Sequence, residues 1–198
     1  MYRGAPASPI ILLSGWANFG AWMGTRSKSF RTGLRYDRRR ISAQGELIFR
    51  EIGQAGAGSF IDWLMAKKGR WLDDRRIKRN WLRESRTSDF YTALIGLPRS
   101  GVVAFVLELG GKAIAGCICL RSSATLEFYI TAFDPKLSAF SPGNLLIEDV
   151  ATWCIARGLD FDFRLTHDPY KLRWSGVFRE YEVFILGVTP VGDRKSVV

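Results

Sequence analysis

The chain has 198 residues, of which 47% are hydrophobic and 13% aromatic, and its formal net charge at neutral pH is +10. A chain of this length and apolar content can bury the core of a whole domain, which excludes a wholly disordered protein. It contains no run of 18 or more apolar residues, which excludes an ordinary transmembrane helix.

The positive charge is concentrated in one part of the chain. Residues 26–100 hold 18 Lys and Arg against 8 Asp and Glu, whereas residues 101–198 hold 10 against 11. This excess suits a partner with phosphates or carboxylates, and a solvated helix face is the equally weighted alternative. We expect no DNA partner. An RNA partner is disfavoured, because no stacking-rich platform or RNA motif is visible.

The N-terminal stretch IILLSGWANFGAWMG (10–24) is apolar but is broken by Ser, Asn and Gly. We interpret it as a strand or connector. A signal peptide is the less favoured alternative, since the basic start is weak and no A-x-A cleavage site follows. Three cysteines without metal-ligand spacing and a single histidine predict free thiols, a cytoplasmic location and no metal site.

Apolar spacing and end signals predict mainly helices in the first half of the chain. The expected elements are helices at 29–45, 58–71, 74–85 and 88–98 and a strand at 46–52. Ser29 can cap the first helix and Gly45 can end it, and Ser88 or Asp89 can cap the last.

The second half changes character. Gly110-Gly111 predicts a tight hairpin between the strands GVVAFVLEL and KAIAGCICL, and Ser122-Ser123 predicts the next turn. The remaining expected elements are a helix at 141–157, a strand at 160–165, a short helix within 167–174 and a strand at 180–188. The order predicts an α+β (α/β mixed) fold, with a mixed, mostly antiparallel central sheet flanked by helices.

The helix at 141–157 has an unusual start. Ser141 can cap it, Pro142 suits its first turn and Gly143 would let a ligand approach closely, while Asn144 and Leu145 add backbone donors. The first N–H groups of a helix lack internal acceptors and lie at its positive end, so they form a natural phosphate site. An ordinary helix start is the alternative, which local sequence alone favours.

The series from AFDPKLSAFSPGNLL through DFDF to YKLRWSGVF resembles the GNAT superfamily of acyl-CoA N-acyltransferases. In that superfamily a helix N-terminus after the fourth strand holds the coenzyme A pyrophosphate, and a short helix with a tyrosine follows. The chain is most similar to the CelD-like GNAT-like domain associated with cellulose and exopolysaccharide biosynthesis, which is related to the Fem-type aminoacyltransferases. The segments that carry this closer resemblance are SFRTGLRYDRRRISAQG, LMAKKGRW, SPGNLLIEDVATWCIARGLDFDF and DPYKLRW. The chain departs from the family in its phosphate loop, where Gly143 stands without the family's further glycines.

The resemblance implies a GNAT-like domain at 28–190, preceded by an extension at 1–27 and followed by a tail at 191–198. We interpret PIILLSGW in the extension as a remnant of another GNAT-like half. A second such half, or polysaccharide-synthesis proteins, are therefore the expected protein partners.

The resemblance also implies transfer of an acyl (acetyl) group from acyl-CoA to an amine or hydroxyl of a sugar, amino acid or envelope precursor. Tyr170 is the candidate general acid, because a phenol of pKa about 10 stays protonated at neutral pH. A packing tyrosine whose hydroxyl is satisfied at the surface is the equally weighted alternative. Glu127, on the strand face of Tyr129, is the first candidate for the general base. Asp162 is the second and His167 the third.

The cofactor would be held by the helix start, with Ser141, Pro142, Gly143, Asn144 and Leu145, and by the cations Lys171 and Arg173. These two side chains could instead hold an acceptor carboxylate or be ordinary surface charges. Two other functions stay open: a non-catalytic GNAT-like module of a polysaccharide-synthesis assembly, and Fem-like transfer from aminoacyl-tRNA. The sequence does not name the acceptor.

Overall fold

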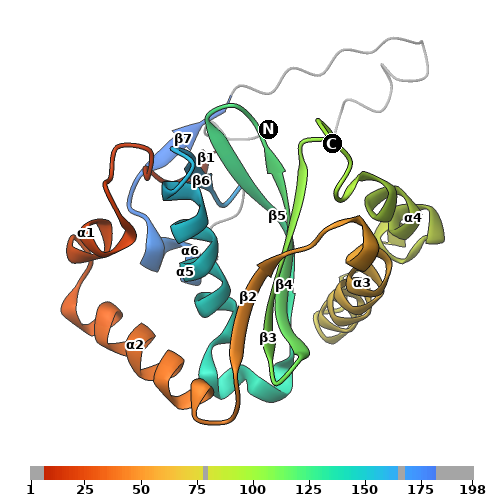
Figure 1. Cartoon of the computed structure of the whole chain (residues 1–198), viewed down its shortest axis with the longest axis horizontal. Coiled ribbons are helices and arrows are strands. Elements are labelled where there is room, and N and C mark those ends of the chain that lie inside the picture. The colour runs from red at the N-terminus through yellow and green to blue at the C-terminus, as the bar shows by residue number, and fades with distance from the viewer. Residues whose placement is uncertain (1–6, 78–79, 165–167, 182–198) are drawn as a thin grey trace.

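A computed structural model describes residues 7–77, 80–164 and 168–181 (Figure 1). These residues form a seven-stranded sheet in the order β2-β3-β4-β5-β6-β1-β7, with helices on both faces. Every pair of neighbouring strands is antiparallel except β5 and β6, which are parallel. The prediction of an α+β fold with a mixed, mostly antiparallel sheet is confirmed.

The strands are β1 (Ala7–Ile11), β2 (Leu47–Glu51), β3 (Val102–Leu109), β4 (Lys112–Arg121), β5 (Thr125–Phe133), β6 (Asp160–Asp162) and β7 (Phe178–Glu180). The α-helices are α1 (Phe19–Gly24), α2 (Lys28–Ser42), α3 (Ala57–Asp74), α4 (Ser85–Leu94), α5 (Pro142–Ile155) and α6 (Pro169–Trp174). Short 3-10 turns are η1 (Gln54–Gly56), η2 (Asn80–Arg83) and η3 (Pro135–Phe140).

Strand alternation divides the core into two layers. On β3, Phe105 and Leu107 face the layer formed with α1, α2, α5 and α6, whereas Ala104 and Val106 face α3 and α4. Successive strand side chains point to opposite faces, so one strand that is buried on both sides serves both layers. In Figure 1, α2 and α5 lie on one side of the sheet and α3 and α4 on the other.

The hairpin between β3 and β4 turns at two glycines, as predicted. Gly110 and Gly111 have φ of +54° and +75°, a region that favours glycine, and Leu109 pairs with Lys112 across the turn. The following turn is closed at Ser122, whose N–H donates to the Thr125 carbonyl at 2.8 Å. The strands β3 to β5 therefore form an antiparallel meander, and β2 pairs antiparallel with the other edge of β3.

The N-terminal stretch contributes an internal strand of the same sheet. β1 lies between β6 and β7, with Ile10 opposite Asp162 and Ala7 opposite Glu180. Ile11 is buried, and so is Trp22 of α1. The segment that we expected to extend the domain thus supplies part of its sheet and core.

The region after α3 differs from the prediction of a helix at 74–85. Arg76 adopts φ of +55° after α3 ends at Asp74, and a left-handed residue ends an α-helix. Among the described residues, the next helical structure is the turn η2. The next helix begins at Ser85, earlier than the predicted caps Ser88 or Asp89.

Two further element boundaries differ from the sequence prediction. α2 is capped by Ser27, whose Oγ accepts from the Phe30 N–H at 3.3 Å, and not by Ser29. The strand predicted at 160–165 is shorter, since β6 ends at Asp162. Most of the strand predicted at 180–188 lies outside the described residues.

The parallel pair β5 and β6 opens after a short contact. Pairing runs only from Thr125 opposite Asp160 to Glu127 opposite Asp162, whereas β5 continues to Phe133. α5 follows β5 and starts beyond its far end, so the opening between the two strands faces the start of this helix. Ligands in open sheets bind outside such a separation of neighbouring strands.

A β-bulge marks β5 beside the opening. Ile118 pairs with Ile130 and Cys119 with Phe128, which leaves Tyr129 as the extra residue of β5. Bulges of this kind re-aim side chains and are enriched next to functional sites.

Candidate active site

The start of α5 retains one backbone donor for a ligand. Ser141 stands at the N-cap position with φ of +50°, and its side chain makes no capping bond. Its carbonyl accepts from the N–H groups of Asn144 and Leu145 at 2.9 and 3.3 Å. Pro142 has no N–H. The Gly143 N–H is thus the first-turn donor without an acceptor among the described residues.

Gly143 also has room around it. A Cβ at this position would lie 3.6 Å from the Phe133 side chain, an ordinary van der Waals contact. The glycine is therefore not required by close packing. A small side chain there would block approach to the helix start without forcing the core apart.

The Asn144 side chain is committed to the core. Its Oδ1 accepts from the Trp174 indole N–H at 3.1 Å. Trp174 is fully buried, stacks on Trp22 at 6.1 Å and meets Phe30 edge-on at 5.0 Å. This asparagine links α5 to α6, a structural role that the sequence pattern did not reveal.

Arg40 is a cation at the α5 start that the sequence analysis did not single out. Its guanidinium lies 4.8 Å from the Phe140 ring centroid and donates to the Ala139 carbonyl at 3.2 Å. A backbone carbonyl leaves the guanidinium charge in place. Lys67, by contrast, is neutralised by Asp134 at 2.8 Å. Arg40 belongs to the run of arginines in α2. The sequence alone does not predict which of these arginines contacts η3.

Tyr170 lies beside the opening between β5 and β6. Its ring meets Phe163 edge-on at 6.2 Å, and Phe163 in turn meets Phe128 of β5 at 6.2 Å. Burial, and secondarily the charge of Asp168, raises the pKa of the Tyr170 phenol above its usual value of 10. The hydroxyl therefore stays protonated at neutral pH and can donate a proton.

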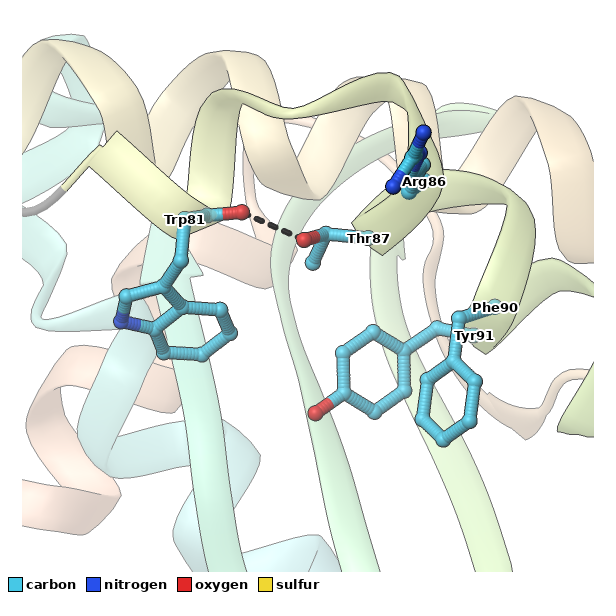
Figure 2. A pocket seen from close by; sticks show the side chains of 5 residues that line it. All are labelled: Trp81, Arg86, Thr87, Phe90 and Tyr91. Carbon is cyan, nitrogen blue, oxygen red and sulfur yellow. Dashed lines mark hydrogen bonds between the residues drawn. The ribbon is translucent and has the colours of Figure 1, made fainter. Parts of the chain in front are cut away.

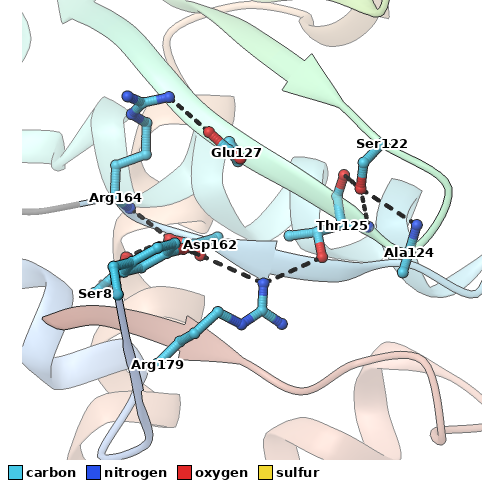
Figure 3. A network of polar contacts seen from close by, with 9 residues as sticks. Ser8, Ser122, Ala124, Thr125, Glu127, Asp162, Arg164 and Arg179 are labelled. Carbon is cyan, nitrogen blue, oxygen red and sulfur yellow. Dashed lines mark hydrogen bonds and ion pairs between the residues drawn. The ribbon is translucent and has the colours of Figure 1, made fainter. Parts of the chain in front are cut away.

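Glu127 lies at the last paired position of β5. Its Oε2 forms an ion pair with the Arg164 guanidinium at 2.6 Å (Figure 3). Arg164 also lies 4.7 Å from the ring centroid of Tyr129. The Glu127 Oε1 has no hydrogen-bond partner among the described residues. Its side chain is 37% exposed, so this oxygen is open to a ligand.

Asp162 is enclosed by donors. The carboxylate is fully buried and accepts from the Ser8 hydroxyl, the Arg164 N–H at 2.7 Å and the Tyr181 hydroxyl at 2.5 Å. Arg179 lies 3.7 Å away (Figure 3). These contacts join β1, β6 and the end of the described chain. A structural role fits this geometry better than proton abstraction from a ligand.

Lys171 and Arg173 do not converge on the α5 start. Lys171 is buried, and its Nζ donates to the Phe163 carbonyl at 2.8 Å and lies 3.7 Å from Asp168 Oδ2. Burial lowers the pKa of this lysine. Arg173 is exposed and lies 5.5 Å from the ring centroid of Phe30 on α2. Lys171 thus holds the end of β6, and Arg173 points toward another helix.

Three further points concern the described residues alone. His167, the third candidate base, lies outside them. Within them, no group of three or more His, Cys, Asp or Glu side chains is placed to hold a metal ion. Their helices include none that is both long and apolar enough to cross a membrane.

The sequence matches the family described as "Acetyltransferase (GNAT) domain" over residues 28–172. Among proteins with curated descriptions, none matches it. The fold is similar to that of FemX, with a TM-score of 0.66 and 10% identity over 90% of this chain and 60% of FemX. It is also similar to a conserved protein of unknown function from Bacteroides thetaiotaomicron VPI-5482, with a TM-score of 0.58 and 14% identity over 88% of this chain and 57% of that one.

A third similar structure is that of "a possible acetyltransferase from Clostridium difficile 630", with a TM-score of 0.53 and 13% identity over 71% of this chain and 98% of that one. At these identities the likeness concerns the fold. The chain spans 57–60% of the length of the Bacteroides protein and FemX. Since the family match covers well over half of the residues, the chain belongs to the Acetyltransferase (GNAT) domain family, which supports acyl transfer in general.

Proposed function

We propose that the chain transfers an acyl group, acetyl in the simplest case, from acyl-CoA to an amine or hydroxyl acceptor at the opening between β5 and β6. One observation carries the proposal. β5 and β6 part immediately after Glu127 and Asp162. Glu127 approaches this opening from the sheet face of Tyr129, and the Tyr170 ring packs through Phe163 on Phe128 from the opposite face.

In the proposed reaction an amine nitrogen attacks the thioester carbonyl, so a C–N bond forms and the C–S bond breaks. The Glu127 carboxylate takes the proton that the attacking nitrogen loses. Tyr170 gives its phenolic proton to the departing thiolate, and the phenolate is reprotonated from solvent. A positioned acid and base of this kind each contribute about 10²–10⁴ in rate.

The acyl-CoA phosphates would be held at the α5 start. The Gly143 N–H supplies a donor at the positive end of the helix. The Arg40 guanidinium, which contacts Ala139 and Phe140 just before the helix, supplies a full charge. Asn144, Lys171 and Arg173 are assigned no contact with the cofactor here, because their side chains are engaged elsewhere.

A non-catalytic module is the second candidate, and one observation favours it. Pro142 lacks an N–H and two following N–H groups are bonded to Ser141, so the helix start offers few donors for a pyrophosphate. A GNAT-like domain that has the fold but no longer binds the cofactor would have such a helix start. Binding of the cofactor separates the two candidates.

The wider setting is proposed from the motif resemblance. It points to polysaccharide or cell-envelope biosynthesis of the CelD-like kind and to a cytoplasmic location, which suits the three buried free thiols. The length of FemX, of which this chain covers 60%, supports a second GNAT-like half as a partner.

Calorimetric titration with acetyl-CoA is the test, using wild type, Gly143→Asp and Tyr170→Phe. The proposal expects wild type and Tyr170→Phe to bind alike, and Gly143→Asp to lose binding because its carboxylate repels the phosphates. Gly143→Ala is the matched control: it adds a side chain without a charge, so it should weaken binding less.

A thiol-release assay with a panel of amines and sugars then tests catalysis. Tyr170→Phe should lower turnover by about 10²-fold or more with unchanged binding. A folded wild type that binds no acetyl-CoA would overturn the enzyme proposal and favour the non-catalytic module.

A further inference from the structure

A separate pocket lies between η2 and α4, on the sheet face opposite α5. It has a volume of about 340 Å³ and is lined by Trp81, Arg86, Thr87, Phe90 and Tyr91 (Figure 2). This volume is at the small end of the range for small-molecule sites, about 300–1,000 Å³. The pocket suits a compact ligand with one ring system.

Its walls are aromatic and partly exposed. Trp81 is 38% exposed and Phe90 is 56% exposed, whereas Tyr91 between them is buried (Figure 2). Phe90 and Tyr91 meet edge-on with centroids 5.2 Å apart. Exposed aromatic faces around a hollow mark ligand sites, because a ring in the hollow covers them and gains stacking contacts.

The Thr87 hydroxyl of the pocket lining is already engaged in a hydrogen bond within the protein. The Thr87 hydroxyl donates to the Trp81 carbonyl, a bond that also ties η2 to α4 (Figure 2). The lining is mainly apolar, so a sugar with several hydroxyls would leave them unpaired there. A planar apolar group has no such cost.

Arg86 gives the pocket one charge. No carboxylate among the described residues forms an ion pair with it. A guanidinium presents a planar fork of donors that matches a carboxylate in two parallel hydrogen bonds. The complementary ligand therefore combines an aromatic ring with one carboxylate.

The pocket is connected to Glu127 through a chain of side-chain contacts. Tyr91 contacts Tyr129, with ring centroids 6.4 Å apart, and Arg164 lies over Tyr129 and pairs with Glu127. A ligand on Tyr91 is thus one aromatic layer away from the residues that hold the proposed base.

We infer that this pocket binds a compact aromatic carboxylate, a ligand class beyond the proposed acyl transfer. The ring lies against Trp81 and Phe90, and the carboxylate pairs with Arg86.

The test is calorimetric titration of the free protein, without acyl-CoA, with phenylalanine and tryptophan. Phenethylamine, which lacks the carboxylate, and alanine, which lacks the ring, are the ligand controls. We expect the two aromatic amino acids to bind about tenfold or more tightly than either control, since a charge-assisted pair and a stacked ring are each absent from one of them.

Variants locate the binding. Arg86→Gln and Trp81→Leu should each weaken phenylalanine binding by about tenfold, with Arg35→Gln on α2 and Trp16→Leu as matched exposed controls that leave it unchanged. Equal binding of phenethylamine and phenylalanine, or no effect of Arg86→Gln, would overturn the inference. Because no acyl-CoA is present, this result is independent of whether the chain binds acetyl-CoA.

Discussion

The sheet has two halves that are built in different ways. The strands β3, β4 and β5 form a meander joined by tight turns, and β2 pairs with the outer edge of β3. The strands β6, β1 and β7 come from both ends of the described chain, with Ile10 opposite Asp162 and Ala7 opposite Glu180. We call these the local half and the non-local half.

The candidate site residues lie where the two halves meet. Glu127 belongs to the local half, whereas Arg164 and Tyr170 follow β6 of the non-local half. α5 connects the halves, and its start faces the opening between them. The difference suggests that the local half provides the rigid frame and that the position of the non-local half decides the geometry of the site.

The largest expected effect comes from breaking the non-local half at Asp162. Asp162→Ala removes the buried acceptor of Ser8, Tyr181 and the Arg164 N–H. Leaving such donors and the nearby Arg179 charge unpaired costs about 3–5 kcal/mol. Urea unfolding measures it, with Asp62→Ala, an exposed change on α3, as the control expected within about 0.5 kcal/mol. A loss as small as the control's would contradict the structural role of Asp162.

A smaller effect is expected from overfilling the local half at Gly116. A Cβ there would lie 2.7 Å from Phe60 and 3.1 Å from Trp63, closer than atoms pack in cores. Gly116→Ala should therefore reduce the free energy of unfolding by about 1–3 kcal/mol. Gly33→Ala on α2, which meets nothing within 4 Å, should instead stabilise by up to about 1 kcal/mol. Thermal unfolding of both variants tests this contrast, and equal melting shifts would refute it.

At the junction between the halves, Asp149 of α5 predicts a pH effect. Burial raises its pKa to about 6, although Arg38 at 2.8 Å opposes the shift. A carboxyl whose pKa is raised in the folded state stabilises fully below its unfolded pKa, near 4, and loses that contribution as the pH rises to about 6. Asp149→Asn cannot ionise. Its melting temperature relative to wild type should therefore rise from pH 4 to pH 7, and a constant difference over this range would disprove the shift.

The smallest effect is expected at the open edge of the local half. Arg50 of β2 and Glu108 of β3 pair at 2.5 Å, but Arg50 is 52% exposed. Hydrogen bonds from Arg50 lower the pKa of Glu108, so the pair stabilises above pH about 4.5 and the gain is lost as the pH falls. Glu108→Gln should cost less than about 1 kcal/mol at pH 7, and less in high salt. A salt-independent loss of several kcal/mol would show that this edge is more than a solvated surface.

Many secondary-structure elements could be predicted from the sequence because the patterns that indicate them span only a few residues. The hairpin at Gly110-Gly111, the alternation on β3 to β5 and the start of α5 at Ser141-Pro142 all depend on residues within a few positions of each other. The helix expected at 74–85 failed for a related reason. Its apolar spacing is helical, but Arg76 takes a left-handed conformation that the pattern does not record.

The candidate site was predicted by residue type and revised by contacts. Tyr170 packs on Phe163 and Glu127 pairs with Arg164, and both keep their proposed roles. Asn144 and Lys171 are both polar side chains that the sequence assigned to the cofactor. In the structure, Asn144 accepts a hydrogen bond from the Trp174 indole, and Lys171 donates to the Phe163 carbonyl. Arg40 was not predicted, because its partner Ala139 lies 99 positions further along the chain.

The amino-acid sequence by itself determined the class of fold, the meander and the helix that follows it, since turn residues and side-chain periodicity act over a few residues. Only the tertiary structure decided that the N-terminal strand enters the sheet between β6 and β7, and that Asp162 is enclosed by donors from both ends of the described chain. Contacts between distant segments depend on the packing of the whole core, and no local pattern encodes which buried polar group will find which partner.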